Sequence, residues 1–180
     1  MSRGRLLPLL MTLMVVGVVG YWAWTGLKSP PLSESRGIIT TPAGWQLLDA
    51  GSFTFYAPKG SVVRQAQRGD LVYGDVIGPN TCLLYSVGPK AAIIADKRTH
   101  SSYSETPIVI DGRPGVLRKA MLNQSEQAHW FGDCGAPLYI GLYLPKALAG
   151  GSSVAIDGTA GSEDARDQVE TIFKSIRFTR

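Results

Sequence analysis

Residues 162–178 read SEDARDQVETIFKSIRF, and they form the most regular stretch of the sequence. Apolar residues recur there at i, i+3, i+4 and i+7, namely Val169, Ile172, Phe173 and Ile176. This spacing predicts an amphipathic helix that packs one apolar stripe against a sheet. Gly161 or Ser162 would cap this helix. Glu163 and Asp164 would place negative charge in its first turn, where the helix dipole favours it.

Upstream of this helix, the sequence shows strand patterns separated by turn signals. Phe53 and Phe55 alternate with more polar residues, which is typical of a half-buried strand. Asp111-Gly112 predicts a hairpin turn, and the polar residues 99–106 predict a loop. Residues 91–97 fit either a short helix or a strand. The predicted strands are residues 51–58, 62–66, 71–77, 81–87, 107–110, 116–122, 137–144 and 153–160.

The N-terminal segment predicts where the protein resides. Residues 6–27 carry no charge, and a helix of this length spans roughly 33 Å, enough to cross a bilayer. Arg3 and Arg5 precede it, which predicts a cytoplasmic N-terminus. The alternative is a cleaved signal peptide, although the bulky residues 21–24 form a poor cleavage site. Both interpretations place the rest of the chain outside the cytoplasm.

The sequence therefore predicts three parts. Residues 1–27 form a membrane anchor or signal peptide, residues 28–43 form a flexible linker rich in Pro and Ser, and residues 44–180 form an extracytoplasmic domain. The predicted fold class is α+β, with a central antiparallel sheet, a C-terminal amphipathic helix packed on one face and one N-terminal transmembrane helix. We expect a single-pass protein of the bacterial inner membrane with its domain in the periplasm, or a periplasmic protein if the segment is cleaved.

The charge distribution argues against a nucleic-acid partner. The chain has a formal net charge of +4 at pH 7. Removing Arg3, Arg5 and Lys28 from the 18 basic residues leaves 15 against 14 acidic ones, so the predicted domain is nearly neutral. It contains no dense basic run interleaved with aromatic residues, which is the usual footprint of nucleic-acid binding.

The two cysteines, Cys82 and Cys134, are predicted to form a disulfide in an oxidising compartment. Closing a loop of about 50 residues would stabilise the fold by about 4 kcal/mol in the chain-entropy model. The alternative is two separate buried thiols. His129 lies near Cys134 in the sequence and would suggest a Cys–His nucleophile pair, but a bonded cysteine supplies no thiolate.

The order of these motifs resembles the PsbP-like α/β/α sandwich superfamily, which includes DcrB-like bacterial periplasmic proteins. The resemblance rests on Trp45 near the domain start, on residues 53–58 (FTFYAP), on residues 110–114 (IDGRP) and on residues 169–178 (VETIFKSIRF). It implies a central antiparallel sheet flanked by helices, with residues 91–97 as the candidate for the family's early helix. It also implies a protein-binding or assembly role, because few members have an established catalytic activity.

The remaining candidate site is an aromatic pair. Trp130 and Phe131 are predicted to lie in a loop as interface anchors, or alternatively to cover the sheet edge and shield the disulfide. The sequence predicts no catalytic residue, metal site or cofactor. The leading hypothesis is a membrane-tethered periplasmic protein-binding or assembly module, for example an immunity protein against a toxin. The alternatives are a cell-envelope enzyme and a domain that binds a small ligand or lipid.

Overall fold

The computed structural model describes residues 41–179, which form ten strands, two α-helices and two short 3-10 turns. The strands are β1 Trp45–Asp49, β2 Phe53–Pro58, β3 Val62–Arg68, β4 Leu71–Gly78, β5 Thr81–Gly88, β6 Ser101–Ile110, β7 Arg113–Met121, β8 Leu138–Leu144, β9 Ser153–Ala160 and β10 Arg177–Phe178. The helices are α2 Gln124–Phe131 and α3 Glu163–Lys174, and the turns are η1 Gly132–Cys134 and η2 Ala149–Gly151.

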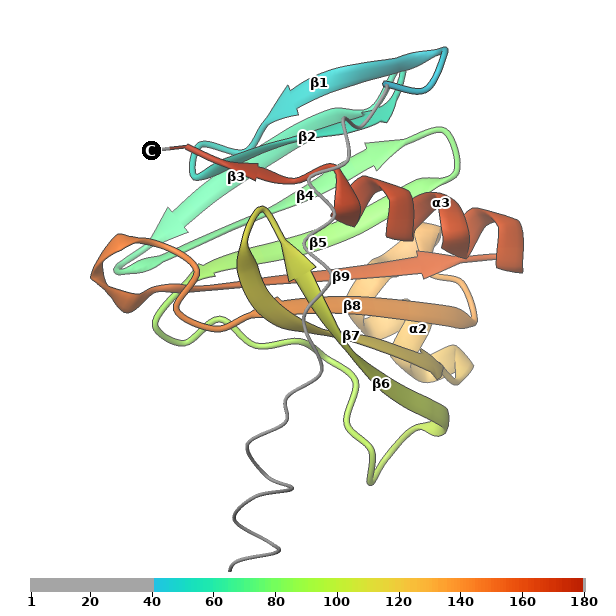
Figure 1. Ribbon diagram of the computed structural model, residues 1–180. Helices are drawn as coiled ribbons and strands as arrows, with labels where there is room; N and C mark the ends of the chain where they lie inside the picture. The colour runs from blue at the N-terminus through green and yellow to red at the C-terminus, as the bar shows by residue number, and fades with distance from the viewer. Residues whose placement is uncertain (1–40, 180) are drawn as a thin grey trace, which may run out of the picture. The chain divides into compact units, whose positions relative to one another are not determined.

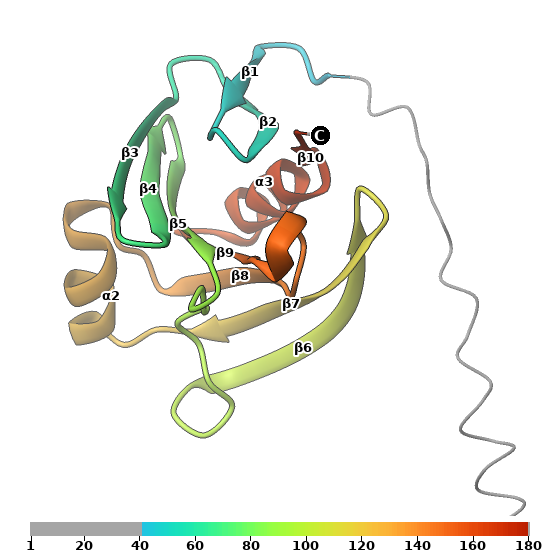
Figure 2. The same cartoon turned by 90° about the vertical axis from the view of Figure 1, so that its left-hand side faces the viewer.

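The strands form two sheets. The larger sheet has seven antiparallel strands in the order β3-β4-β5-β9-β8-β7-β6, and the smaller one has the order β1-β2-β10 (Figure 1). The larger sheet curls around α3 and the smaller sheet, as the turned view shows (Figure 2). We call the side of the larger sheet that holds α3 its inner face and the opposite side its outer face.

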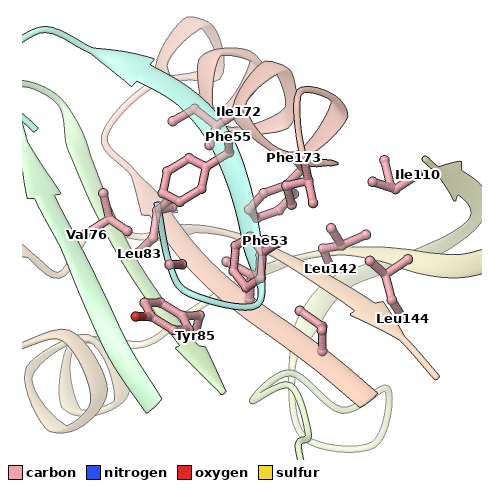
Figure 3. Close-up of a cluster of buried hydrophobic side chains, with 14 of the residues drawn as sticks. Phe53, Phe55, Val76, Leu83, Tyr85, Ile110, Leu142, Leu144, Ile172 and Phe173 are labelled. Atoms are coloured by element: carbon pink, nitrogen blue, oxygen red, sulfur yellow. The ribbon is translucent and has the colours of Figure 1, made fainter. Parts of the chain in front are cut away.

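The main hydrophobic core fills the inner face. Phe53 and Phe55 of β2 lie among side chains from α3 and from the central strands of the larger sheet (Figure 3). From α3, Val169, Ile172 and Phe173 are almost completely buried. Gly158 of β9 allows this close approach, because a Cβ there would lie 2.7 Å from Leu83 and 3.0 Å from Val169.

Smaller elements cover the outer face. Residues 89–100, an irregular segment between β5 and β6, and helix α2 lie on this side of the sheet (Figure 2). Their apolar residues form a second cluster with side chains of β5, β7 and β8. The buried members of this cluster are Cys82, Ala95, Ala120, Leu122, Phe131 and Tyr139.

The predicted α+β class is wrong, because the described chain is mostly sheet. Strands hold 50% of it, the two helices together with the two 3-10 turns hold 19%, and the strands build two sheets instead of one. The polar residues 99–106, predicted as a loop, belong largely to β6, whose exposed side chains need no apolar alternation because this strand lies at the sheet margin. Residues 91–97 form neither a helix nor a strand. Helix α2 stands where no helix was predicted.

The predicted transmembrane helix falls on residues that the structure does not describe. In residues 41–179, no helix is long and apolar enough to cross a membrane. The predicted anchor over residues 1–27 and most of the predicted linker over residues 28–43 lie outside the described residues. The first described strand begins at Trp45, close to the predicted start of the domain.

Candidate functional site

The two cysteines form the predicted disulfide. Cys82 on β5 is bonded to Cys134 in η1, across 52 residues of sequence and a Cα–Cα distance of 6.0 Å. Cys82 is buried against Phe131 in the outer-face cluster. The bond therefore attaches the segment after α2 to the centre of the sheet, and it removes the thiol that a Cys–His nucleophile pair would need.

The predicted aromatic pair is divided between the surface and the core. Trp130 is 47% exposed, and its ring stands edge-on to His129 with 4.7 Å between centroids. Phe131 is buried beside the disulfide. Neighbouring residues of a helix point about 100° apart, so α2 turns one ring outward and the other inward. Only Trp130 can act as a surface anchor.

A buried carboxylate on the outer face was not predicted from the sequence. Asp157 of β9 is 5% exposed, and Tyr139 of β8 is fully buried. The Tyr139 hydroxyl donates a hydrogen bond of 2.5 Å to Asp157 Oδ1, and the Ile94 N–H donates to the same oxygen at 2.9 Å. The Ala95 N–H donates to the Tyr139 hydroxyl at 3.4 Å. These bonds attach residues 89–100 to the sheet.

A glycine makes room for this pair. Gly141 lies two residues after Tyr139 on the same face of β8, and it is the register partner of Asp157 on β9. A Cβ at Gly141 would overlap the Tyr139 hydroxyl. The missing side chain therefore opens the space in which the tyrosine ring lies along its own strand and reaches the carboxylate.

Burial changes the acidity of both partners. Burial raises the pKa of Asp157 from 3.8 to about 6, although the bonds from Tyr139 and Ile94 and the charge of Arg118 oppose the shift. Burial, followed by the charge of Asp157, raises the pKa of Tyr139 well above 10. Both groups therefore favour their neutral forms more than they would in water.

Charged residues surround the surface end of this network. The Arg118 guanidinium donates to Ala95 O at 3.1 Å and to Glu105 Oε2 at 2.8 Å. The Tyr103 hydroxyl donates to the same Glu105 oxygen at 2.6 Å. The bond from Tyr103, together with Arg118, lowers the pKa of Glu105. An open depression of about 490 Å³ lies here, lined by Asp96, Lys97, Tyr103, Ser104, Glu105 and Arg118.

Of the two histidines, His100 packs within the outer face. The His100 side chain is 5% exposed, and its Nδ1 accepts the Asp96 N–H at 3.1 Å. Its Nε2 lies 3.4 Å from Glu126 Oε1 on α2. The His100 ring therefore lies between residues 89–100 and α2, and its buried Nε2 makes no hydrogen bond within the described residues, whereas His129 is exposed. No group of three or more His, Cys, Asp or Glu residues in the described part of the chain is placed to hold a metal ion.

Every ionisable group of this network already has a partner within the chain. Asp157 accepts two hydrogen bonds, Glu105 accepts two, and Arg118 donates to two different groups. In residues 41–179 no hydroxyl or thiol of this network stands beside a free base, which is the arrangement that nucleophilic catalysis uses. These hydrogen bonds can hold residues 89–100 against the sheet. The charged side chains of Glu105 and Arg118 line the 490 Å³ surface depression.

Comparisons with known proteins give no family assignment. No protein-family model matches the chain, and a search of curated proteins finds no match. The resemblance to the PsbP-like superfamily therefore stays a prediction.

Proposed function

We propose that the domain is an extracytoplasmic, non-catalytic module that binds another protein. The main support is a contrast, within the described residues, between the ionisable side chains of the outer face and the margins of the larger sheet. Asp157 and Glu105, the carboxylates of the network on the outer face, are paired with Tyr139 and Arg118, whereas both margins of the seven-stranded sheet are unpaired. Unpaired strand margins present backbone donors and acceptors, which are a common route of protein recognition.

The disulfide supports the extracytoplasmic location. Disulfides persist in oxidising compartments and are rare in the cytosol of most organisms. The bond between Cys82 and Cys134, which attaches the segment after α2 to the sheet, therefore favours an oxidising compartment.

The cavities of the described chain support a binding site for a small ligand or lipid less than they support a protein-binding role. A cavity of about 10 Å³ lies in the inner-face core among Phe53, Tyr85 and Phe173, which is about the size of one water. A second open depression, of about 480 Å³, lies beside the disulfide at the start of α3. It and the 490 Å³ depression are open at the surface, whereas ligand sites enclose most of the ligand.

Crosslinking in intact cells of the source organism tests the proposal. The tagged full-length protein is crosslinked before lysis, captured and analysed, with an unrelated tagged exported protein as control. We expect one protein in stoichiometric amount that the control does not capture. Thiol alkylation before lysis checks the location, since Cys82 and Cys134 should be protected until reductant is added. Free thiols would contradict the location, and the absence of a specific protein partner would contradict the binding role.

A further inference from the structure

The two margins of the seven-stranded sheet differ in their chemistry. The sheet ends in β3 on one side and in β6 on the other (Figure 2). The register of β6 with β7 shifts between Ser101 and Ser104, and the hairpin turn closes on Ile110 and Arg113. In an antiparallel pair, alternate residues direct their backbone N and O atoms toward the neighbouring strand and away from it. Ile110 directs these atoms toward β7, so Pro107, three residues earlier, directs its nitrogen away from β7. Its missing N–H interrupts the outer edge of β6, which is a common protection of an edge strand.

β3 has no such interruption. It contains neither Pro nor Gly, and it pairs with β4 from Val62 to Arg68 without a register shift. The two-residue turn closes on Arg68 and Leu71, so alternate residues of β3 direct their N–H and C=O groups away from β4. The outward residues are Val63, Gln65 and Gln67. Within residues 41–179 the backbone groups of these three make no hydrogen bond, and residues 64–68 are exposed.

The side chains of β3 on the outer face form a short pattern of charge. Arg64 and Arg68 lie four residues apart on this face, with Ala66 between them. Arg64 binds Asp75 through both carboxylate oxygens at 2.7 Å yet remains 68% exposed, and Arg68 makes no ion pair in the described chain. Tyr73, the register partner of Ala66 on β4, is 43% exposed. The margin therefore presents an apolar patch, Ala66 and Tyr73, with one arginine on each side of it.

We infer that the β3 margin binds an extended acidic segment of a partner protein, which adds to the sheet as a further strand; this inference rests on the proposed protein-binding function. Directly opposite residues of paired strands lie about 4.5–5.5 Å apart. Acidic residues at i and i+4 of the segment would face Arg64 and Arg68, and an apolar residue at i+2 would cover Ala66. A second copy of β3 fits less well, because antiparallel pairing about Ala66 would set Arg64 opposite Arg68.

A designed peptide tests this assignment with the full-length, oxidised chain. The probe is a capped, fluorescent peptide, Thr-Glu-Thr-Ile-Thr-Glu-Thr, and its matched control carries Lys in place of Glu. We expect saturable binding of the acidic probe by fluorescence anisotropy and weaker binding of the basic control. Changing Arg68→Glu should weaken the acidic probe about fivefold and strengthen the basic one, because cross-strand charge pairs contribute up to about 1 kcal/mol.

A proline variant isolates the backbone contribution. Gln67→Pro removes an outward N–H and leaves the ladder with β4 intact, just as Pro107 does at the other margin, whereas Gln67→Ala keeps the N–H. We expect the proline variant to weaken the acidic probe about tenfold relative to the alanine variant, from one lost hydrogen bond and the disturbed pairing around it. Both variants should unfold at nearly the same denaturant concentration, which shows that the sheet is unchanged.

The outcomes separate this inference from the proposed function. No saturable binding of the acidic probe, or equal binding by the two Gln67 variants, overturns the β3 assignment. A concentration-dependent dimer that Gln67→Pro abolishes also overturns it, because the occupant is then a second copy. A crosslinked protein partner that both Gln67 variants capture equally leaves the protein-binding function standing and removes its placement at β3. If no protein partner is found at all, the proposed function itself fails.

Discussion

Replacing Asp157 with Asn tests most directly whether burial beside Tyr139 raises the pKa of Asp157. Both hydrogen bonds to this side chain reach the same oxygen, Oδ1, from the Tyr139 hydroxyl and the Ile94 N–H. An asparagine can present its carbonyl oxygen to the same two donors. The substitution therefore keeps the geometry and removes the cost of a buried negative charge.

The magnitude follows from the pKa of Asp157, which burial raises from 3.8 to about 6. A shift of about two units corresponds to roughly 3 kcal/mol. Because the folded-state pKa is the higher one, protonation of Asp157 stabilises the fold fully below pH 4, and this contribution is lost as the pH rises through 6. The positive charge of Arg118 lowers the pKa of Asp157 and so opposes part of the shift.

The assay compares the free energy of unfolding of the oxidised wild type and Asp157→Asn from pH 4 to pH 8. We expect the free energy of unfolding of the variant to exceed that of the wild type by near zero at pH 4 and by at most roughly 3 kcal/mol at pH 7 and above. Taking the difference cancels the other carboxylates, including Glu105 and Glu170, whose lowered pKa values act in the opposite direction in both proteins. A difference that stays constant with pH would refute the raised pKa of Asp157.

A matched variant separates the charge from the hydrogen bonds. Asp157→Ala removes the acceptor and leaves the Tyr139 hydroxyl and the Ile94 N–H without it. We expect destabilisation at neutral pH, because each unpaired buried donor costs roughly 1–3 kcal/mol. If the alanine variant were as stable as the asparagine variant at pH 7, the hydrogen bonds would not hold residues 89–100 to the sheet.

Three further predictions concern the disulfide, the core and the glycine under the tyrosine. Replacing Cys82 and Cys134 by Ser should lower the free energy of unfolding by about 4 kcal/mol in denaturant titrations; an unchanged midpoint would show that the bond adds nothing. Phe173→Ala should cost about 3–5 kcal/mol because this side chain is fully buried, and a loss under about 0.5 kcal/mol, typical of a surface site, would contradict its packing. Gly141→Ala should destabilise the wild type by about 1–3 kcal/mol from overpacking but cost less in a Tyr139→Ala background, and equal costs in a double-mutant cycle would mean that the two residues do not clash.

Helix α3 could be predicted from the sequence because it buries an apolar face. The spacing of Val169, Ile172 and Phe173 marks α3, and all three are buried in the core. The Ser162 hydroxyl accepts the Ala165 N–H as an N-cap. The sequence placed these residues because the helical period and the capping chemistry are local properties, which need no knowledge of distant strands.

The misjudged elements lie at the surface. β6 is a margin strand whose residues 104–107 are exposed, so no alternation of apolar residues marks it. Helix α2 buries only Phe131, so no apolar stripe marks it either. It does carry a local signal: Asn123 and Glu126 form a capping box, with hydrogen bonds of 3.0 Å and 2.9 Å. The capping box therefore marks the start of α2 in the sequence.

The buried pair depends on information that the sequence does not display. Tyr139 and Asp157 meet only because the register of β8 with β9 sets Asp157 opposite Gly141. A shift of one residue would turn Asp157 toward the inner face, among the apolar side chains. The cysteines were easier to pair, because two cysteines allow a single intramolecular disulfide.

The two faces of the larger sheet are covered by different forces. On the inner face, α3 buries three large apolar side chains, which hold a helix without covalent help. On the outer face, α2 buries one, and residues 89–100 have no regular structure. The disulfide from Cys134 to the sheet and the hydrogen bonds to Asp157 supply what apolar burial does not. The outer face is therefore the part of the fold that we expect to be most sensitive to redox state and pH.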